Sequence, residues 1–123
     1  MIDIENKEQL EDFIWNNKDK VIVIYFGAEW CGPCKKLKDR LDSNEGKLTM
    51  PDLIVGHIDI DSKENQSLCE LYQISSIPVQ IFISLKETQI IEEKRIIGYD
   101  WVNFTMTYNS IIDEKHNENN TSS

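Results

Sequence analysis

Hydrophobic and polar residues follow two different periods along the first part of the chain. Leu10, Phe13 and Ile14 repeat with three- and four-residue spacing, which predicts a helix over about residues 7–17. Residues 21–26, by contrast, are continuously apolar and mostly β-branched. Such a run is typical of a strand that is buried on both faces in the middle of a sheet.

A second helix and a second strand are predicted in the next segment. Pro33 suits the first turn of a helix, whose inward face would carry Leu37 and Leu41. Gly46 is a residue that can end this helix. Residues 53–60 are again rich in apolar and β-branched side chains, and they predict a strand.

The second half of the chain predicts a short helix followed by two strands. The helix would turn Leu68, Leu71 and Tyr72 inward. Residues 79–83 and 90–97 have the composition of strands, and a short polar turn separates them. This arrangement predicts an antiparallel hairpin.

A last amphipathic helix is predicted after Asp100, which can cap it. Its apolar residues are Trp101, Phe104, Tyr108, Ile111 and Ile112. From residue 116 onward the chain is polar and has no apolar anchor, so we expect a disordered tail. The expected organisation is therefore one domain over residues 1–115 and a tail over residues 116–123.

The order of these elements indicates the fold class. Strands that alternate with helices favour parallel crossovers, and the hairpin adds antiparallel strands. We therefore expect an α/β fold, with a mixed central sheet of four to five strands and helices on both faces.

Composition and charge exclude several classes of protein. The chain has 123 residues, which is the usual length of one domain. With 13 basic and 22 acidic residues its net charge is −9, which argues against binding to nucleic acid or to anionic lipid. The first residues show no secretory signal, and the longest apolar run falls far short of a membrane span. We expect a cytoplasmic monomer that binds neither nucleic acid nor membrane.

Two of the three cysteines carry the chemical interest of the sequence. Cys31 lies just before the predicted helix and Cys34 lies in its first turn, so the two sulfurs are close enough to bond each other. A helix amino terminus offers unpaired N–H groups and a partial positive charge, so the pKa of Cys31 should be lowered. Cys34 is more shielded and should keep its proton longer. Between them, Gly32 lets a substrate backbone approach, and Pro33 stiffens the turn.

Two other interpretations of the cysteine pair stay open from the residues alone. One is a zinc site completed by Cys69 and His57, although such sites normally combine two cysteine pairs. The other is a purely structural pair. Cys69 itself, on a predicted helix, is by default a small buried hydrophobe, and the alternative is a regulatory or dimerising thiol.

The segment Trp-Cys-Gly-Pro-Cys-Lys, residues 30–35, resembles the active-site motif of the thioredoxin family. The resemblance extends over about residues 2–112. It also includes Phe26-Gly-Ala-Glu-Trp30, Ile58-Asp-Ile-Asp61, Ile77-Pro78 and Gly98.

This resemblance implies the thioredoxin fold and a protein-disulfide oxidoreductase activity. Cys31 would be the nucleophile and Cys34 the resolving cysteine, with a redox-active Cys31–Cys34 disulfide and neither a bound cofactor nor a metal. The implied partners are thioredoxin reductase or another dithiol donor, and target proteins that contain disulfides.

The resemblance also implies a cis peptide bond before Pro78 and a shallow docking surface, where the backbone of Ile77 can pair with an extended substrate. That surface would consist of Trp30, Gly32, Pro33, Ile60, Ile77, Pro78 and Gly98. For Trp30 and Ile60 the alternative is simple packing in the core.

The sequence departs from the family behind the resolving cysteine. Where the family usually has a buried aspartate and a lysine, this chain has Tyr25 and His57. Tyrosine is a poor base at neutral pH, whereas histidine titrates there. We therefore expect His57 to handle the proton of Cys34, directly or through water; the alternative is that both residues only pack.

Two other functions remain alternatives to a reducing dithiol carrier. One is an oxidase or isomerase of the protein-disulfide-isomerase kind. The other is a thioredoxin-like binding or chaperone subunit that uses the same surface without redox chemistry.

Overall fold

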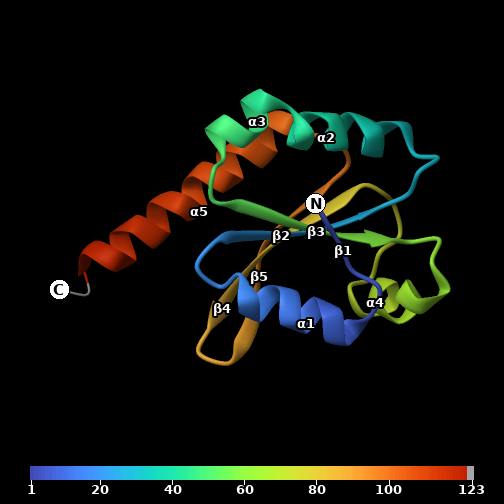
Figure 1. Cartoon of the computed structure of the whole chain (residues 1–123), viewed down its shortest axis with the longest axis horizontal. Coiled ribbons are helices and arrows are strands. Elements are labelled where there is room, and N and C mark those ends of the chain that lie inside the picture. The colour runs from blue at the N-terminus through green and yellow to red at the C-terminus, as the bar shows by residue number, and fades with distance from the viewer. Residues whose placement is uncertain (122–123) are drawn as a thin grey trace.

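The computed structural model describes residues 1–121 of the chain. A short strand β1 comes first, and five helices, one 3-10 turn and four longer strands follow (Figure 1). The elements are β1 (Ile2–Asp3), α1 (Lys7–Asn16), β2 (Val21–Gly27), α2 (Gly32–Asp42), α3 (Asn44–Thr49), β3 (Leu53–Asp59), η1 (Lys63–Asn65), α4 (Gln66–Leu71), β4 (Val79–Lys86), β5 (Gln89–Ile97) and α5 (Trp101–Thr121).

The sheet has five strands in the order β1-β3-β2-β4-β5. The pairs β1–β3 and β2–β3 are parallel, whereas β2–β4 and β4–β5 are antiparallel. Helices α1 and α4 cover one face, and α2, α3 and α5 lie on the other (Figure 1). The expected α/β class, with a mixed sheet between helices, is confirmed.

Strand β2 is the centre of the molecule, and all seven of its residues are buried. Val23 and Tyr25 point into the core under α2 and α5, while Ile22 and Ile24 point into the core under α1. The continuous apolar run is thus explained, because a strand covered on both faces has no side for polar residues.

The predicted end of the second helix at Gly46 is wrong. Helix α2 ends at Asp42, and the hydroxyl of Ser43 accepts a hydrogen bond from the backbone N–H of Gly46 at 3.0 Å, which caps α3. Gly46 is buried inside α3, where a Cβ atom would collide with the carbonyl oxygen of Arg40. Glycine at this position therefore permits close approach of the two helices rather than a helix end.

The inward face predicted for the helix that became α4 is also partly wrong. Leu68 is buried as expected, but Leu71 is 58% exposed. The inward face is centred on Asn65, Leu68 and the half-buried Tyr72, so Leu71 lies to one side of it. Asn65 is polar and so lay outside the apolar pattern; its Nδ2 donates to the carbonyl of Asp59 at 3.1 Å, and its buried Oδ1 accepts no hydrogen bond from the described residues.

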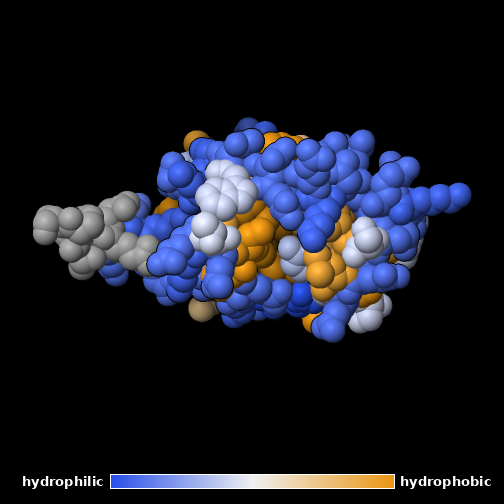
Figure 2. Space-filling model, turned by 90° about the horizontal axis from the view of Figure 1, so that it is seen from below, coloured by the Kyte–Doolittle hydropathy of each residue, from blue (hydrophilic) through white to orange (hydrophobic). Residues whose placement is uncertain are grey.

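Apolar side chains remain visible among polar ones on the face seen in Figure 2. Leu71, Ile90 and Tyr72 line a hollow of about 410 Å³ between α1, the end of α4 and the β4–β5 hairpin. The exposure of Leu71 thus belongs to a surface depression outside the cysteine pair.

Helix α5 begins as predicted and continues further than predicted. The carboxylate of Asp100 accepts a hydrogen bond from the N–H of Asn103 at 3.1 Å, which caps the helix. The helix then runs to Thr121, so residue 116 does not begin a separate tail (Figure 1). No glycine or proline interrupts residues 101–121, and polar residues alone do not stop a helix. The remainder of the expected tail, residues 122–123, lies outside the described residues.

Across residues 1–121, none of the helices combines the length and the apolar character that a membrane crossing needs.

Candidate active site

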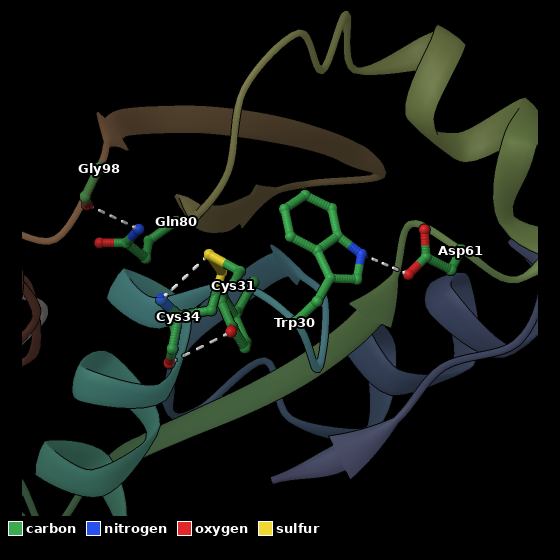
Figure 3. The surroundings of a disulfide bond; sticks show 7 residues. Trp30, Cys31, Cys34, Asp61, Gln80 and Gly98 are labelled. Carbon is green, nitrogen blue, oxygen red and sulfur yellow. Dashed lines mark hydrogen bonds between the residues drawn. A yellow bond between two sulfur atoms is a disulfide. The ribbon is translucent and has the colours of Figure 1, made fainter.

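The two cysteines of interest lie at the amino terminus of α2, where the chain leaves the carboxyl end of β2. They form a Cys31–Cys34 disulfide, with Cα atoms 5.2 Å apart (Figure 3). Cys31 is 5% exposed and Cys34 is 1% exposed. The predicted deeper burial of Cys34 is therefore confirmed.

Cys31 is also the amino-terminal cap of α2. Its Sγ accepts a hydrogen bond from the backbone N–H of Cys34 at 3.2 Å, and its carbonyl accepts from Lys35 at 3.2 Å. In the reduced protein the same N–H and the positive end of the helix dipole would face a Cys31 thiolate. Both favour the charged form, which is the arrangement expected of a nucleophilic cysteine.

Trp30 lies on the surface beside the disulfide and is 67% exposed. Its indole N–H donates to a carboxylate oxygen of Asp61 at 2.7 Å, which ties the ring to the segment after β3 (Figure 3). Core packing is therefore not the role of Trp30. Ile60, by contrast, is half-buried and packs against both cores.

The rest of the expected docking surface comes from the loop before β4 and the end of β5. The Ile77–Pro78 peptide bond is cis, as expected, with Ile77 half-buried and Pro78 buried. Gly98 has a φ of 92°, a left-handed conformation that favours glycine, and its N–H donates to the carbonyl of Pro78 at 2.7 Å. Gly32 and Pro33 are exposed at the start of α2.

Tyr25 lies behind Cys34. Its hydroxyl donates to the carbonyl oxygen of Cys34 at 3.5 Å, and burial raises the pKa of Tyr25 to about 12. The phenol therefore stays protonated at neutral pH and is not the base for Cys34.

His57 packs behind Tyr25 rather than against a cysteine. The two rings are stacked with centroids 5.0 Å apart, and His57 Nδ1 lies 3.1 Å from a carboxylate oxygen of Asp3. His57, Tyr25 and Cys34 all line one open cavity of about 810 Å³. The structure thus brings His57 and Cys34 to a common cavity but not into direct contact.

Three residues of this region were missed by the sequence analysis. Asp3, the partner of His57, gave no signal because strand β1 has only two residues. Ile97 is 66% exposed next to Gly98 and was assigned simply to a strand. Gln80 is completely buried and donates through Nε2 to the carbonyl of Gly98 at 3.2 Å. Gln80 could have been noticed as the single polar residue among the apolar residues at the start of this strand.

The family model described as "Thioredoxin" matches residues 2–98. The chain belongs to the thioredoxin family. Family membership makes the matched region a protein-disulfide oxidoreductase, an enzyme of thiol–disulfide exchange, and the Cys31–Cys34 pair is its redox disulfide.

Two thioredoxins and one glutaredoxin are similar to this chain. Thioredoxin of Chlamydia pneumoniae is 37% identical over 81 residues, which cover 66% of this chain and 72% of that protein. Monothiol glutaredoxin-4 of Saccharomyces cerevisiae is 28% identical over 102 residues, which cover 79% of this chain but only 41% of that protein. Trichomonas vaginalis thioredoxin matches the fold with a TM-score of 0.78, at 22% identity, over 90% of this chain and 96% of that one.

The thioredoxin fold separates the four residues of the zinc alternative. Cys31 and Cys34 belong to the core on the α2 face, whereas Cys69 packs on the α1 face. Among the side chains of residues 1–117, no group of three or more histidine, cysteine, aspartate and glutamate residues could hold a metal ion. Cys69 is a free, half-buried thiol whose pKa is raised by burial.

Proposed function

We propose that this protein is a dithiol carrier that reduces disulfides in target proteins. The observation that supports it most is the hydrogen bond from Cys34 N–H to Cys31 Sγ at the head of α2, together with the deeper burial of Cys34. This asymmetry gives one cysteine a stabilised thiolate and leaves the other as a protected thiol.

The reaction proceeds by two exchanges. The Cys31 thiolate attacks one sulfur of the target disulfide and forms a mixed disulfide, and the first target sulfur leaves as a thiolate. Cys34 then loses its proton and attacks the Cys31 sulfur, which releases the second target thiolate. Two electrons pass to the target, whose thiolates take up two protons, and a Cys31–Cys34 disulfide remains.

The docking surface that we propose for the target surrounds this disulfide. Ile77 and the exposed Ile97 offer apolar contacts at the ends of two antiparallel strands. The exposed ring of Trp30 lies on the other side of the disulfide. The full proposed set is Trp30, Gly32, Pro33, Ile60, Ile77, Pro78 and Gly98, with Ile97 added from the structure.

His57 is the residue that we propose for proton handling at Cys34. It shares a cavity with Cys34, so a water molecule there can carry the proton between them, and the Asp3 carboxylate lies 3.1 Å from His57 Nδ1. Other charged groups lining this cavity are Glu5, Glu29, Lys35, Lys38, Asp42 and Asp59. Direct transfer is disfavoured because Tyr25 lies between the imidazole and the cysteine.

The cellular setting is also part of the proposal. We propose an electron carrier of a reducing compartment such as the cytoplasm, recharged by thioredoxin reductase or another dithiol donor. The free thiol of Cys69 is compatible with such a compartment. We further propose that the described residues form one domain, because one sheet and its two cores take in both the amino-terminal strand and α5, and that this domain acts as a monomer.

The decisive experiment is reduction of insulin disulfides, followed by turbidity. The full chain should accelerate reduction by a dithiol donor or by candidate thioredoxin reductases, and Cys69→Ser should react at the same rate. Absence of acceleration with every donor would contradict the proposal.

A reduction potential then separates the two redox alternatives. A value of about −270 mV fits a reducing carrier, whereas about −180 mV fits a disulfide isomerase. If a Cys31→Ser/Cys34→Ser double variant kept full biological activity, the non-enzymatic binding function would be the correct one.

A further inference from the structure

Strand β5 forms one edge of the sheet, and within residues 1–121 it pairs with β4 alone. It is nine residues long, and Ile90 and Ile97 near its two ends are 39% and 66% exposed. A long edge strand offers its outer backbone N–H and C=O groups to another strand. The side chains of β5 therefore decide which strand can pair there.

The sequence of β5 is complementary to its own reverse. Residues 90–97 are Ile-Ile-Glu-Glu-Lys-Arg-Ile-Ile, so two isoleucines stand at each end, and an acidic half and a basic half meet in the middle. A second, antiparallel copy centred on this segment would give the pairs Ile90 with Ile97, Ile91 with Ile96, Glu92 with Arg95 and Glu93 with Lys94. Each pair would join two apolar side chains or two opposite charges, and both kinds of cross-strand pair are stabilising.

A bulge in β5 makes this pairing possible. Side chains that face each other across an antiparallel pair share a face of the sheet, but residues three apart on a regular strand, such as Glu92 and Arg95, point to opposite faces. The register of β5 against β4 shifts at Glu93, which is an extra residue. Glu92 and Arg95 consequently line the same hollow as Ile90, beside α1. Glu93 and Lys94 lie together on the other face, against α5.

The isoleucines of each proposed pair share a face as well. Ile97 is opposite Val79, a residue of the core under α1, so it lies on the same face as Ile90. Their inner neighbours, Ile91 and Ile96, point the other way, because successive residues of a strand alternate. The place of Ile96 in the core under α5 agrees with this.

Charges and a bulge on an edge strand normally discourage association. On β5 they reject most strands, since an arbitrary partner would set apolar or like-charged side chains against them. A second copy of β5 is the strand whose charges run in the matching order. Glu92 and Arg95 already pair within the chain at 2.8 Å, whereas Glu93 and Lys94 form no ion pair with the described side chains. The central pair therefore gains most from a partner.

We propose that β5 is a self-complementary surface through which two copies of this chain associate, with their sheets joined edge to edge about a two-fold axis. Pairing through one strand buries less than the about 1,600 Å² of a standard interface, so the dimer is weak and reversible. It would place Ile90 of the second copy on Ile97, next to Gly98 of the proposed docking surface. The dimer thus withholds that surface, and the monomer is the form that reduces targets. Only this last step rests on the proposed function.

The first test measures the association of the full chain by sedimentation equilibrium. A Cys69→Ser background excludes a disulfide dimer through the free thiol. This parent should dimerise with a Kd below about 1 mM. Lys94→Glu and Glu93→Lys should each raise Kd about tenfold or more, because both central pairs of the dimer become like-charged. The matched controls are Lys47→Glu and Glu45→Lys, on exposed positions of α3, which should leave Kd unchanged.

Mixing the two variants separates strand pairing from damage to the fold. Positions 93 and 94 are both acidic in Lys94→Glu and both basic in Glu93→Lys, so opposite charges meet again in a mixed dimer. An equimolar mixture should therefore associate about as tightly as the parent, which a misfolded variant could not do. If either variant does not fold, Ile90→Thr replaces it and should also raise Kd.

Three results of this test would overturn the inference. One is a parent that stays monomeric up to about 1 mM. The second is a mixture that stays monomeric, and the third is an equal rise of Kd in the α3 controls.

The reduction of insulin tests whether the dimer withholds the docking surface. The rate per molecule of the parent should fall as its concentration passes through the measured Kd. Lys94→Glu should match the parent at high dilution and keep its rate per molecule over the same range. A parent that dimerises without this fall would show that the docking surface stays open. A chain that dimerises but never reduces insulin would overturn the proposed function and not the self-association.

Discussion

The imidazole of His57 stacks on the ring of Tyr25, with centroids 5.0 Å apart and ring planes 25° from parallel. At one end of this stack Asp3 contacts His57, and at the other the hydroxyl of Tyr25 contacts the Cys34 carbonyl. Asp3 and His57 are thus linked, through a phenol that stays protonated at neutral pH, to the buried Cys34.

The histidine in this stack should control the pH dependence of the resolving step. His57→Ala should lower the rate of mixed-disulfide resolution at neutral pH by about tenfold or more, because general-base assistance is lost. It should also remove the imidazole step from the pH–rate profile, measured by stopped-flow reduction of a disulfide substrate. The matched control is His116→Ala, the other histidine of the chain, which is exposed on α5. Superimposable profiles for His57→Ala and wild type would sink this assignment.

The two cysteines should give opposite phenotypes. Cys34→Ser should accumulate a mixed disulfide between Cys31 and the target, detectable by non-reducing electrophoresis and mass spectrometry, because no resolving thiol remains. Cys31→Ser should give no adduct through this site, since its replacement removes the accessible nucleophile. A Cys34→Ser variant that turned over as fast as wild type would show that the roles are assigned incorrectly.

Tyr25 should make the stability of the protein sensitive to alkaline pH. Burial raises its pKa from 10.0 to about 12, so folding favours the protonated phenol. Its contribution is fully present below pH 10 and is lost as the pH rises through about 12. The loss has an upper limit of about 3 kcal/mol.

Denaturant unfolding of wild type and Tyr25→Phe between neutral and alkaline pH measures this effect. Lysine titration affects both proteins, so the difference between their curves isolates Tyr25. The difference between the two free energies of unfolding should be constant below pH 10. It should change between pH 10 and about 12, where Tyr25 of the wild type loses its contribution. Parallel curves across the whole range would contradict the raised pKa.

Asp61 should matter for target binding although it lies outside the cysteine motif. Asp61→Ala removes the acceptor of the Trp30 indole, so the exposed ring is no longer held beside the disulfide. A hydrogen bond of this kind is worth about 1 kcal/mol, so KM for a protein disulfide should rise about fivefold with little change in kcat.

The conservative variant tests the reason for that effect. Asp61→Asn keeps a carbonyl oxygen for the indole N–H and should restore most of the affinity. An equal loss in both variants would mean that the charge of Asp61, and not the position of Trp30, is what the target senses.

The strongest patterns of the sequence predicted the elements well, and the errors have local causes. Residues 21–26 were predicted to be a central strand because the run is continuously apolar and β-branched, and β2 confirms this. Gly46 misled the prediction because glycine serves both helix ends and close contacts, and only the packing of α3 shows which applies. Leu71 misled it because the buried side of the helix includes Asn65, a polar residue that an apolar pattern cannot detect, and Leu71 lies away from that side.

The candidate site also contains residues that the sequence could place and residues that it could not. Cys31, Cys34 and Pro33 are contiguous, so their spacing alone places them at a helix start. Asp3 and His57 are 54 positions apart and meet only because β1 pairs with β3 in one register.

The sequence by itself determined the order of strands and helices, the thioredoxin motif and the likeness of residues 2–98 to that family. These are properties of contiguous or regularly spaced residues. Only the tertiary structure decided what surrounds the sulfurs. Strand pairing sets Tyr25 opposite Gln80. Burial then keeps the phenol of Tyr25 protonated and leaves Gln80 Oε1 without a hydrogen-bond donor among the described residues. Desolvation and the pairing of distant strands depend on the whole fold, which is why no local pattern contained them.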